Sequence, residues 1–162
     1  MQIKILKAKA SDAVILTDIA FTAKRFWKYP ESYYLLWQEE LSITPDYLRR
    51  NIVYRVEFQD RIVGFYSIVK VPEDIYSGEV LIRKGFWMEH IFILPQYHNL
   101  GLGTKLVEHA RSICKKTDIK RLFIFVDPNT RGFYEKCGAE YCYDSKSSIS
   151  GRTIPVYKLS FL

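Results

Sequence analysis

A chain of 162 residues suits one domain spanning residues 1–162, because two domains would each have to fold on about 80 residues. Its composition, 48% hydrophobic and 26% charged, is that of a globular protein and excludes intrinsic disorder and fibrous or collagen-like structure. The net charge of +6 favours an anionic partner, such as nucleic acid, a phosphate-rich cofactor or an acidic substrate.

The first third of the chain predicts one strand and then helices. Residues 2–7 alternate between apolar and polar side chains, as a strand does. A Ser-Asp pair can cap a helix over residues 13–27, where apolar residues recur at helical spacing. After Pro30, residues 31–41 have the spacing of a second helix, and residues 44–46 open a short third one with proline in its first turn.

The middle of the chain changes to strand-forming residues. Residues 52–58 and 62–71 are rich in Val, Ile, Phe and Tyr, and the polar residues 59–61 between them predict a hairpin. Residues 72–84 form a polar excursion with room for one short strand. Residues 86–94 are strongly apolar and end before a proline, which predicts a buried strand.

The last third alternates helices and strands. Residues 101–116 have the apolar stripe of an amphipathic helix, and residues 122–126 form a continuous apolar strand. A short helix over 129–136 ends at a glycine, and strands over 139–143 and 154–161 close the chain. This order predicts an α/β domain, with one mixed central sheet of about six to seven strands and helices on both faces.

Cysteine usage and the N-terminus bear on the cellular setting. The three cysteines are odd in number and lack paired spacing, so a reduced, cytoplasmic protein is expected. Cys137 and Cys142 lack a second ligand pair, so no metal is expected; Cys114 and Cys137 are expected in the core. The chain has no apolar run of membrane-spanning length, and residues 1–10 lack the features of a signal peptide, so no membrane partner is expected.

Residues 91–104 are the most informative segment. A buried strand ends, a short loop follows, and Gly101 and Gly103 open a helix. Glycine lets a backbone approach a ligand closely, and a helix start leaves unpaired N–H groups, so the segment can hold a diphosphate. It is neither a dinucleotide fingerprint, because Leu106 stands where a third glycine belongs, nor a P-loop. The alternative is that both glycines only relieve a tight turn.

Residues 127–139 follow the next buried strand and end in Phe-Tyr-Glu-Lys-Cys-Gly-Ala. A strand, a glycine-opened helix, a strand and this ending resemble the GNAT superfamily of acyl-CoA-dependent N-acetyltransferases. The resemblance extends from Trp87 to Tyr143, and the rest of the chain agrees with the family in element order. It implies a GNAT-like sheet and acetyl-CoA as the cofactor.

The resemblance also implies roles for individual residues. The family loop Arg/Gln-x-x-Gly-x-Gly/Ala matches residues 98–103, whose amides would hold the coenzyme A diphosphate. The strand at 91–93 would pair with the pantetheine arm, and Tyr134 would donate a proton to the departing thiolate. The implied cofactor-binding residues are Ile91, Phe92, Ile93, His98, Asn99, Leu100, Gly101, Leu102, Gly103, Thr104, Asn129 and Tyr134.

This sequence departs from the family pattern at two positions. His98 replaces the usual Arg or Gln, which removes a permanent charge or an amide and should weaken cofactor binding at most. Asp127 stands where the family often has Asn, and Asn129 follows two places later. A contact between Asn129 and the pantetheine is therefore the weaker part of the implied site.

The chemistry also needs a base. Deprotonating an amine with a pKa near 10.4 at pH 7 costs about 4 to 5 kcal/mol, so a base must lie near it, directly or through water. Glu89 is the first candidate, because it shares strand parity with Ile91 and Ile93; His90 is the second. The alternatives are that both only bond neighbouring groups, and that Tyr134 only packs beside Phe133.

Six aromatic residues lie among the twelve residues of 26–37, where the chain average of 15% would give about two. In the family, this helical pair borders the acceptor site. Such a wall suits a small substrate with an apolar body, or a cation over a ring face. Core packing and the contact surface of a homodimer are the alternatives. His109, beside Glu108 in the middle of its helix, is expected at the surface.

Together, these features predict an enzyme that transfers the acetyl group of acetyl-CoA to a primary amine of a small molecule, by direct attack in a ternary complex. One alternative changes the acceptor to a protein N-terminus or lysine. Another is a non-catalytic module that binds acyl-CoA or nucleic acid. The basic residues lie in scattered pairs, so a solvated basic face is favoured over a nucleic-acid site.

Overall fold

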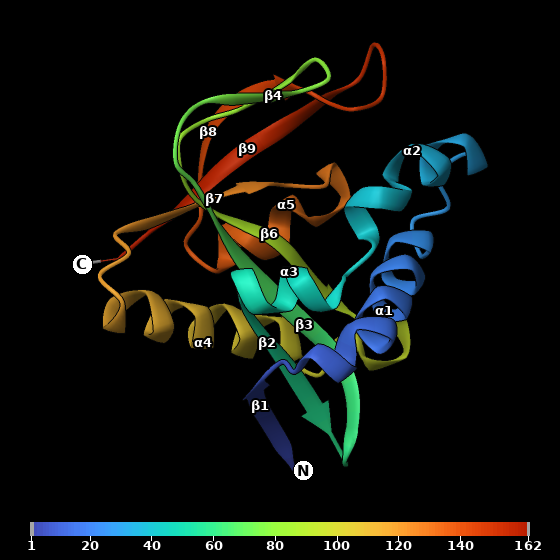
Figure 1. The fold of residues 1–162 in the computed structure, drawn as a ribbon, viewed down its shortest axis with the longest axis vertical. Coiled ribbons are helices and arrows are strands. Elements are labelled where there is room, and N and C mark those ends of the chain that lie inside the picture. The colour runs from blue at the N-terminus through green and yellow to red at the C-terminus, as the bar shows by residue number, and fades with distance from the viewer. Residues whose placement is uncertain (1, 162) are drawn as a thin grey trace. The chain divides into compact units, whose positions relative to one another are not determined.

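A computed structural model describes residues 2–161 (Figure 1). Seven strands form one mixed sheet in the order β1-β2-β3-β6-β7-β9-β8, and β4 pairs with β5 in a separate small sheet. The strands are β1 (Ile3–Lys7), β2 (Ile52–Phe58), β3 (Arg61–Val71), β4 (Ile75–Ser77), β5 (Val80–Ile82), β6 (Gly85–Ile93), β7 (Arg121–Phe125), β8 (Glu140–Lys146) and β9 (Thr153–Ser160). The helices are α1 (Ala13–Arg25), α2 (Glu31–Leu41), α3 (Pro45–Arg50), α4 (Leu102–Lys116) and α5 (Arg131–Lys136), with short 3₁₀ turns at η1 (Ala10–Asp12), η2 (Pro95–Tyr97) and η3 (Pro128–Thr130).

The predicted α/β class and mixed sheet are confirmed, with two local differences. Residues 72–84 hold two short strands rather than one, because Gly78 at φ +62° allows the chain to turn back between β4 and β5. The first helix ends at Arg25 rather than at Trp27, and Lys28 at φ +55° marks the break in the chain that follows.

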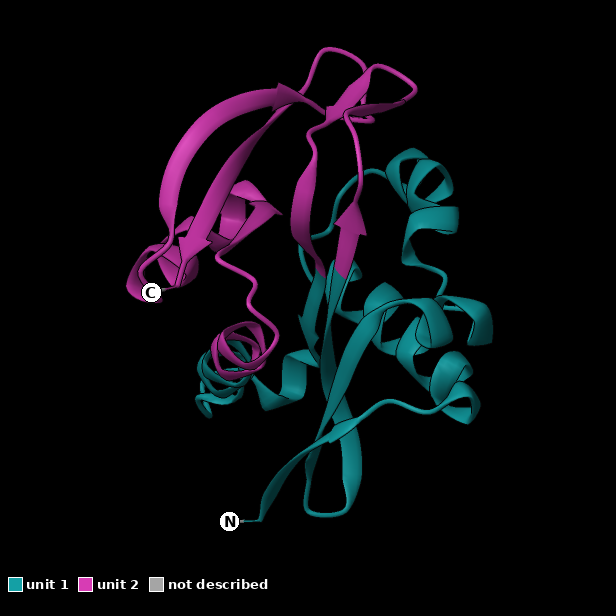
Figure 2. Cartoon of the chain, turned by 60° about the vertical axis from the view of Figure 1, so that its left-hand side comes forward, with its two compact units in different colours: residues 1–68, 90–109 teal, residues 69–89, 110–162 magenta. Residues whose placement is uncertain are grey.

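The chain forms two compact units (Figure 2): residues 1–68 with 90–109, and residues 69–89 with 110–162. Strands β3 and β6 and helix α4 each run from one unit into the other. Within residues 2–161, no helix is long and apolar enough to span a membrane. That residues 1–162 act as a single domain stays a prediction.

In the first unit, helices lie on both faces of the sheet, with α1 to α3 on one face and the start of α4 on the other (Figure 2). Ser67 Oγ lies 2.9 Å from the hydroxyl of Tyr47 in α3. The neighbouring residue, Tyr66, places its hydroxyl 2.8 Å from Nδ1 of His109 in α4. Because side chains alternate along a strand, β3 carries a helical layer on each face.

In the second unit, β6 and β7 run parallel, with Trp87 opposite Phe123. Strand β9 pairs antiparallel with both β7 and β8. The core of this unit is built on the buried residues Val71, Trp87 and Val156, and the ring of Trp87 stacks on Phe125 at 4.6 Å between centroids. The start of β6 is therefore anchored by aromatic packing on β7.

Candidate active site

The loop before α4 presents a row of unpaired main-chain amides. Asn99 and Gly101 have φ angles of +64° and +78°, so the backbone alternates into the left-handed region as it enters the helix. The first helical hydrogen bond runs from Lys105 N to Gly101 O. Within residues 2–161, none of the amides from Asn99 to Thr104 donates to a main-chain carbonyl. We call residues 98–104 the amide cradle.

The amide cradle fits an anion. Successive N–H groups in a backbone that alternates between right- and left-handed conformations make an anion-binding concavity. The cradle also lies at the N-terminus of α4, a helix of 15 residues, where the partial positive charge of the helix is located. The whole cradle belongs to the first unit. These residues therefore suit the diphosphate of coenzyme A.

His98 lies at the start of the cradle and is held on two sides. Its Nε2 lies 3.3 Å from the carbonyl oxygen of Ile93, at the end of β6. The ring of Phe26 meets the imidazole edge-on, with 5.0 Å between centroids. The His98 imidazole therefore links the cradle both to the end of β6 and to the segment after α1. The sequence alone did not predict its contact with Phe26.

The part of β6 that leads to the cradle is held unevenly against β3. The amide of His90 donates to Ser67 Oγ at 3.1 Å, where a regular ladder would supply a carbonyl. Further along, a Cβ atom at Gly64 would lie 2.5 Å from the carbonyl oxygen of Phe92, so β3 approaches β6 too closely there for any side chain. Sequence reasoning missed this contact, because Ser67 and His90 are 23 positions apart.

The two predicted catalytic residues belong to the second unit. Glu89 lies on β6, two residues beyond Trp87, and its side chain is exposed. Tyr134 in α5 is only 7% exposed, and its ring packs edge-on against Phe133 at 5.1 Å. The proton-donor role of Tyr134 and the base role of Glu89 stay predictions.

The environment of Tyr134 keeps its phenol protonated. Burial raises the pKa of the Tyr134 hydroxyl well above its ordinary value, and the nearby Cys137 and Asp127 raise it further. A phenol in this state is neutral at physiological pH and can donate a proton. That is the state that the predicted acid needs before the thiolate departs.

Asn129 is hydrogen-bonded to Asp127, the residue that stands where the family often has asparagine. The carboxylate oxygen Oδ1 of Asp127 accepts hydrogen bonds from the main-chain N of Asn129 at 2.9 Å and from its side-chain Nδ2 at 3.0 Å. Asp127 thereby caps the turn before α5. The Nδ2 group of Asn129 is thus already engaged, and its contact with the pantetheine stays a prediction.

Two other expectations need correction. His109 is half-buried rather than at the surface, because its ring packs 4.6 Å from that of Tyr54 and its Nδ1 bonds the Tyr66 hydroxyl. Cys137 is half-buried, whereas Cys114 lies in the core as expected. Burial raises the pKa of the Cys114 thiol to about 12, so it is not a nucleophile at neutral pH.

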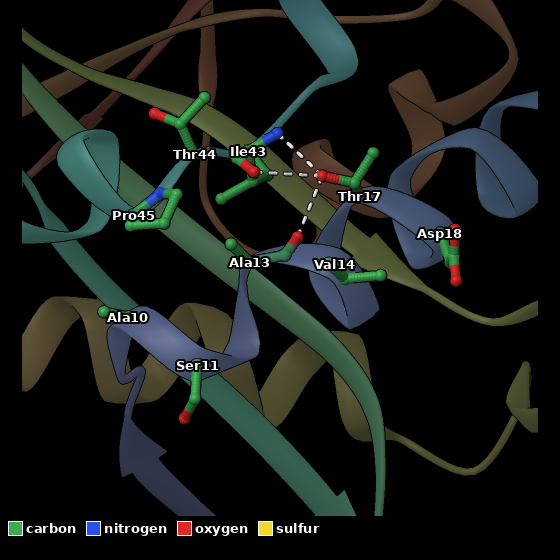
Figure 3. Close-up of a pocket in the computed structure, with 9 residues that line it drawn as sticks. All are labelled: Ala10, Ser11, Ala13, Val14, Thr17, Asp18, Ile43, Thr44 and Pro45. Carbon is green, nitrogen blue, oxygen red and sulfur yellow. Dashed lines mark hydrogen bonds between the residues drawn. The ribbon is translucent and has the colours of Figure 1, made fainter.

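A separate cavity of about 430 Å³ lies between the start of α1 and the segment before α3 (Figure 3). Its walls are mostly small or apolar side chains, with Asp18 as the charged residue among them. The hydroxyl of Thr17 bonds the main chain of Ala13 and Ile43, which joins the two walls. None of the predicted site residues lines this cavity, which no sequence motif predicts.

Comparison with known proteins places these features in a family. The model of the acetyltransferase (GNAT) family matches residues 15–139. The peptidyl-lysine N-acetyltransferase YjaB of Escherichia coli strain K12 is 26% identical over 133 residues, which cover 78% of this chain and 86% of that protein.

Solved structures agree on the fold. The crystal structure of the PaiA N-acetyltransferase from Thermoplasma acidophilum in complex with coenzyme A superposes with a TM-score of 0.76 at 18% identity, covering 99% of this chain and 100% of that one. The ribosomal-protein-S18-alanine N-acetyltransferase from Escherichia coli gives a TM-score of 0.67 at 16% identity, covering 99% and 94%.

The family match spans both the strand that leads into the amide cradle and the segment that carries Tyr134. The unpaired amides of the cradle are the donors that a coenzyme A diphosphate requires. The chain therefore belongs to the acetyltransferase (GNAT) family and is an N-acetyltransferase that uses acetyl-CoA.

Proposed function

We propose that the protein transfers the acetyl group of acetyl-CoA to a primary amine of a small molecule by direct attack in a ternary complex. The observation that carries the proposal is the run of unpaired amides from Asn99 to Thr104 at the start of α4. It supports binding of the coenzyme diphosphate at this loop. Cys114 is buried with a raised thiol pKa, which argues against a cysteine nucleophile there.

In the proposed reaction, Glu89 and Tyr134 each transfer a proton. Bound acetyl-CoA supplies the acetyl group as an activated thioester. Glu89 accepts a proton from the acceptor ammonium, directly or through water, so that the neutral amine can form the new C–N bond. Tyr134 gives its proton to the sulfur as the C–S bond breaks, and the buried, protonated phenol suits that role. The second proton that the nitrogen loses as the amide forms returns to the Tyr134 phenolate, directly or through water. The main chain of 91–93 holds the pantetheine arm.

The aromatic segment after α1 supports an acceptor of modest size. The rings of Tyr29, Tyr33 and Trp37 contact one another, with centroids 5.3 to 5.8 Å apart. Phe26, at the start of this segment, contacts His98 at the start of the amide cradle. An acceptor with an apolar body would find flat aromatic surface close to the coenzyme loop.

A lysine side chain of a protein is the second candidate acceptor. It is favoured by the similarity to YjaB, a peptidyl-lysine N-acetyltransferase that is 26% identical over 78% of this chain. A lysine side chain is also a primary amine, so the roles proposed for Glu89 and Tyr134 apply to both acceptors.

An acceptor panel tests the proposal. Release of free coenzyme A thiol is measured with acetyl-CoA and small primary amines, with lysine-containing peptides, and with peptides blocked at lysine. Turnover with small amines at a kcat/KM at least about tenfold above that of the peptides supports the proposal. The reverse order would replace it with peptidyl-lysine acetylation, and thiol release from neither class would reject both.

A further inference from the structure

Three aromatic side chains of the first unit form what we call the aromatic corner: Tyr29, Tyr33 and Trp37. The rings of Tyr29 and Tyr33 stack at 5.8 Å, and each meets Trp37 nearly edge-on, at 5.3 and 5.6 Å between centroids. Trp37 is buried, whereas Tyr29 and Tyr33 are half-buried. Such an arrangement attracts a positive charge.

The corner already holds an alkylammonium group from the chain itself. Nζ of Lys24 lies 4.4 Å from the centroid of the Trp37 ring and 5.7 Å from that of Tyr29. Lys24 belongs to α1, whereas Trp37 belongs to α2, so its flexible stem reaches across between the two helices. The ammonium shows which ligand chemistry the corner accepts.

The corner is built by contacts that do not involve the Lys24 side chain. The hydroxyl of Tyr34, a buried residue of α2, accepts a hydrogen bond from the main-chain N of Tyr29 at 3.0 Å and lies 3.4 Å from the carbonyl oxygen of Lys24. The segment that leads into the corner is thus fixed through its backbone. Displacement of the Lys24 ammonium would leave these backbone contacts in place.

Two residues after Lys24, the ring of Phe26 contacts His98 at the start of the amide cradle, in the same unit. The corner therefore lies along the segment that borders the coenzyme loop. A ligand in the corner would be positioned by the same stretch of chain that touches the loop.

We propose that the aromatic corner binds an alkylammonium group of the acceptor, and that Lys24 occupies the corner as an internal substitute until the acceptor displaces it. The acceptor would then be an amine with a second positive charge: one nitrogen stays protonated in the corner, and the other is acetylated. The acceptor role rests on the proposed function, whereas binding of an alkylammonium ion to the corner does not.

Arg25 provides a matched control, because it makes the same kind of contact without belonging to the corner. Its guanidinium lies 4.4 Å from the ring of Tyr34 and is held by both carboxylate oxygens of Glu31, at 3.0 and 3.1 Å. Replacing Arg25 removes a cation–π contact between α1 and α2 but leaves the corner unchanged. A general loosening of the helix pair would affect the Lys24 and Arg25 variants alike.

Binding is tested first with tetramethylammonium chloride, which cannot be acetylated. Its affinity is measured in every variant from the shifts of the main-chain amide NMR resonances of residues 29–37, with sodium chloride as the ionic-strength control. Lys24→Met should bind the probe about two- to fivefold more tightly than the unaltered protein, because the competing ammonium is gone. Lys24→Arg, which returns a cation to the corner, should restore the weaker binding, and Arg25→Met should match the unaltered protein.

The acceptor role is tested with pairs of amines that differ only in a second positive charge. Lys24→Met should lower KM for the doubly charged amine by about two- to fivefold and leave KM for its singly charged partner unchanged. The double variant that combines Lys24→Met with Trp37→Leu should no longer show the lower KM for the doubly charged amine.

Two results would overturn the corner as a binding site: equal probe affinity in Lys24→Met and Arg25→Met, or probe binding that survives Trp37→Leu in a variant that still unfolds cooperatively. If the probe binds as expected but no amine is acetylated, the corner stands as a binding site and the proposed function is rejected. Turnover without a difference between singly and doubly charged amines would keep the proposed function and reject the acceptor role of the corner.

Discussion

Burial differs between the two residues that we propose for proton transfer. Tyr134 is inside the protein, where the neutral phenol is favoured and a proton is retained until charge develops on a neighbouring atom. Glu89 is exposed, so its side chain is accessible from solvent. These environments are compatible with the proposed roles of Tyr134 as proton donor and Glu89 as proton acceptor.

Tyr134→Phe removes the proposed proton donor but leaves the ring that packs against Phe133. We expect kcat to fall by roughly ten- to a thousandfold, with KM for acetyl-CoA nearly unchanged, because the hydroxyl acts only as the C–S bond breaks. Steady-state thiol release measures both constants. A kcat equal to that of the unaltered protein would assign Tyr134 to packing alone.

Glu89→Gln removes the proposed base without changing the size of an exposed side chain. We expect the pH–rate profile to move to higher pH, because without the carboxylate only amine molecules that are already deprotonated in solution can react. The profile of kcat/KM between pH 6 and 10 gives the result. An unmoved profile would place the base elsewhere, with His90 as the next residue to replace.

At the scale of elements, the junction of β6, the amide cradle and α4 is organised by local geometry. The strand delivers the chain to the loop, and the positive φ angles of Asn99 and Gly101 turn the amides outward before α4 begins. Ser67 and Gly64 set the spacing between β6 and β3 on the approach to that loop. The cradle thus depends on backbone conformation more than on the identity of its side chains.

Gly101→Ala tests whether the cradle depends on its backbone conformation, and Gly151→Ala is the matched control. Both glycines have a φ of +78°, and an added Cβ meets no atom within 4 Å at either position, so each alanine costs about 1 kcal/mol through backbone strain alone. Both variants should lose similar stability in urea denaturation, while only Gly101→Ala should weaken acetyl-CoA binding. Equal acetyl-CoA affinity in the two variants would contradict the cradle.

At the scale of the whole molecule, the net charge of +6 acts on every anionic ligand. Coenzyme A carries several phosphate charges, so the field of the protein should assist its capture at low ionic strength. Half-buried ion pairs, such as that of Arg55 with Asp12, are screened less by salt than exposed charges are. The fold should therefore tolerate salt better than coenzyme binding does.

Salt titration gives the corresponding prediction. KM for acetyl-CoA should rise by roughly two- to tenfold between 0.05 and 0.5 M sodium chloride. KM for S-acetylpantetheine, which lacks the diphosphate, should change little. Acetyl-CoA should also raise the thermal unfolding midpoint of the protein; no thermal protection at saturating acetyl-CoA would reject the cradle as its binding site.

The sequence by itself determined the features that short-range rules govern. Helix 31–41, the glycines that open α4, and the strand that precedes them depend on periodicity and turn chemistry within a few residues. Only the tertiary structure decided which distant residues meet: Ser67 with the amide of His90, Tyr66 with His109, Phe26 with His98, and Lys24 with Trp37. The physical reason is that local pattern fixes the direction in which a side chain points along its own element, whereas its partner depends on how separate elements pack, which no local spacing encodes.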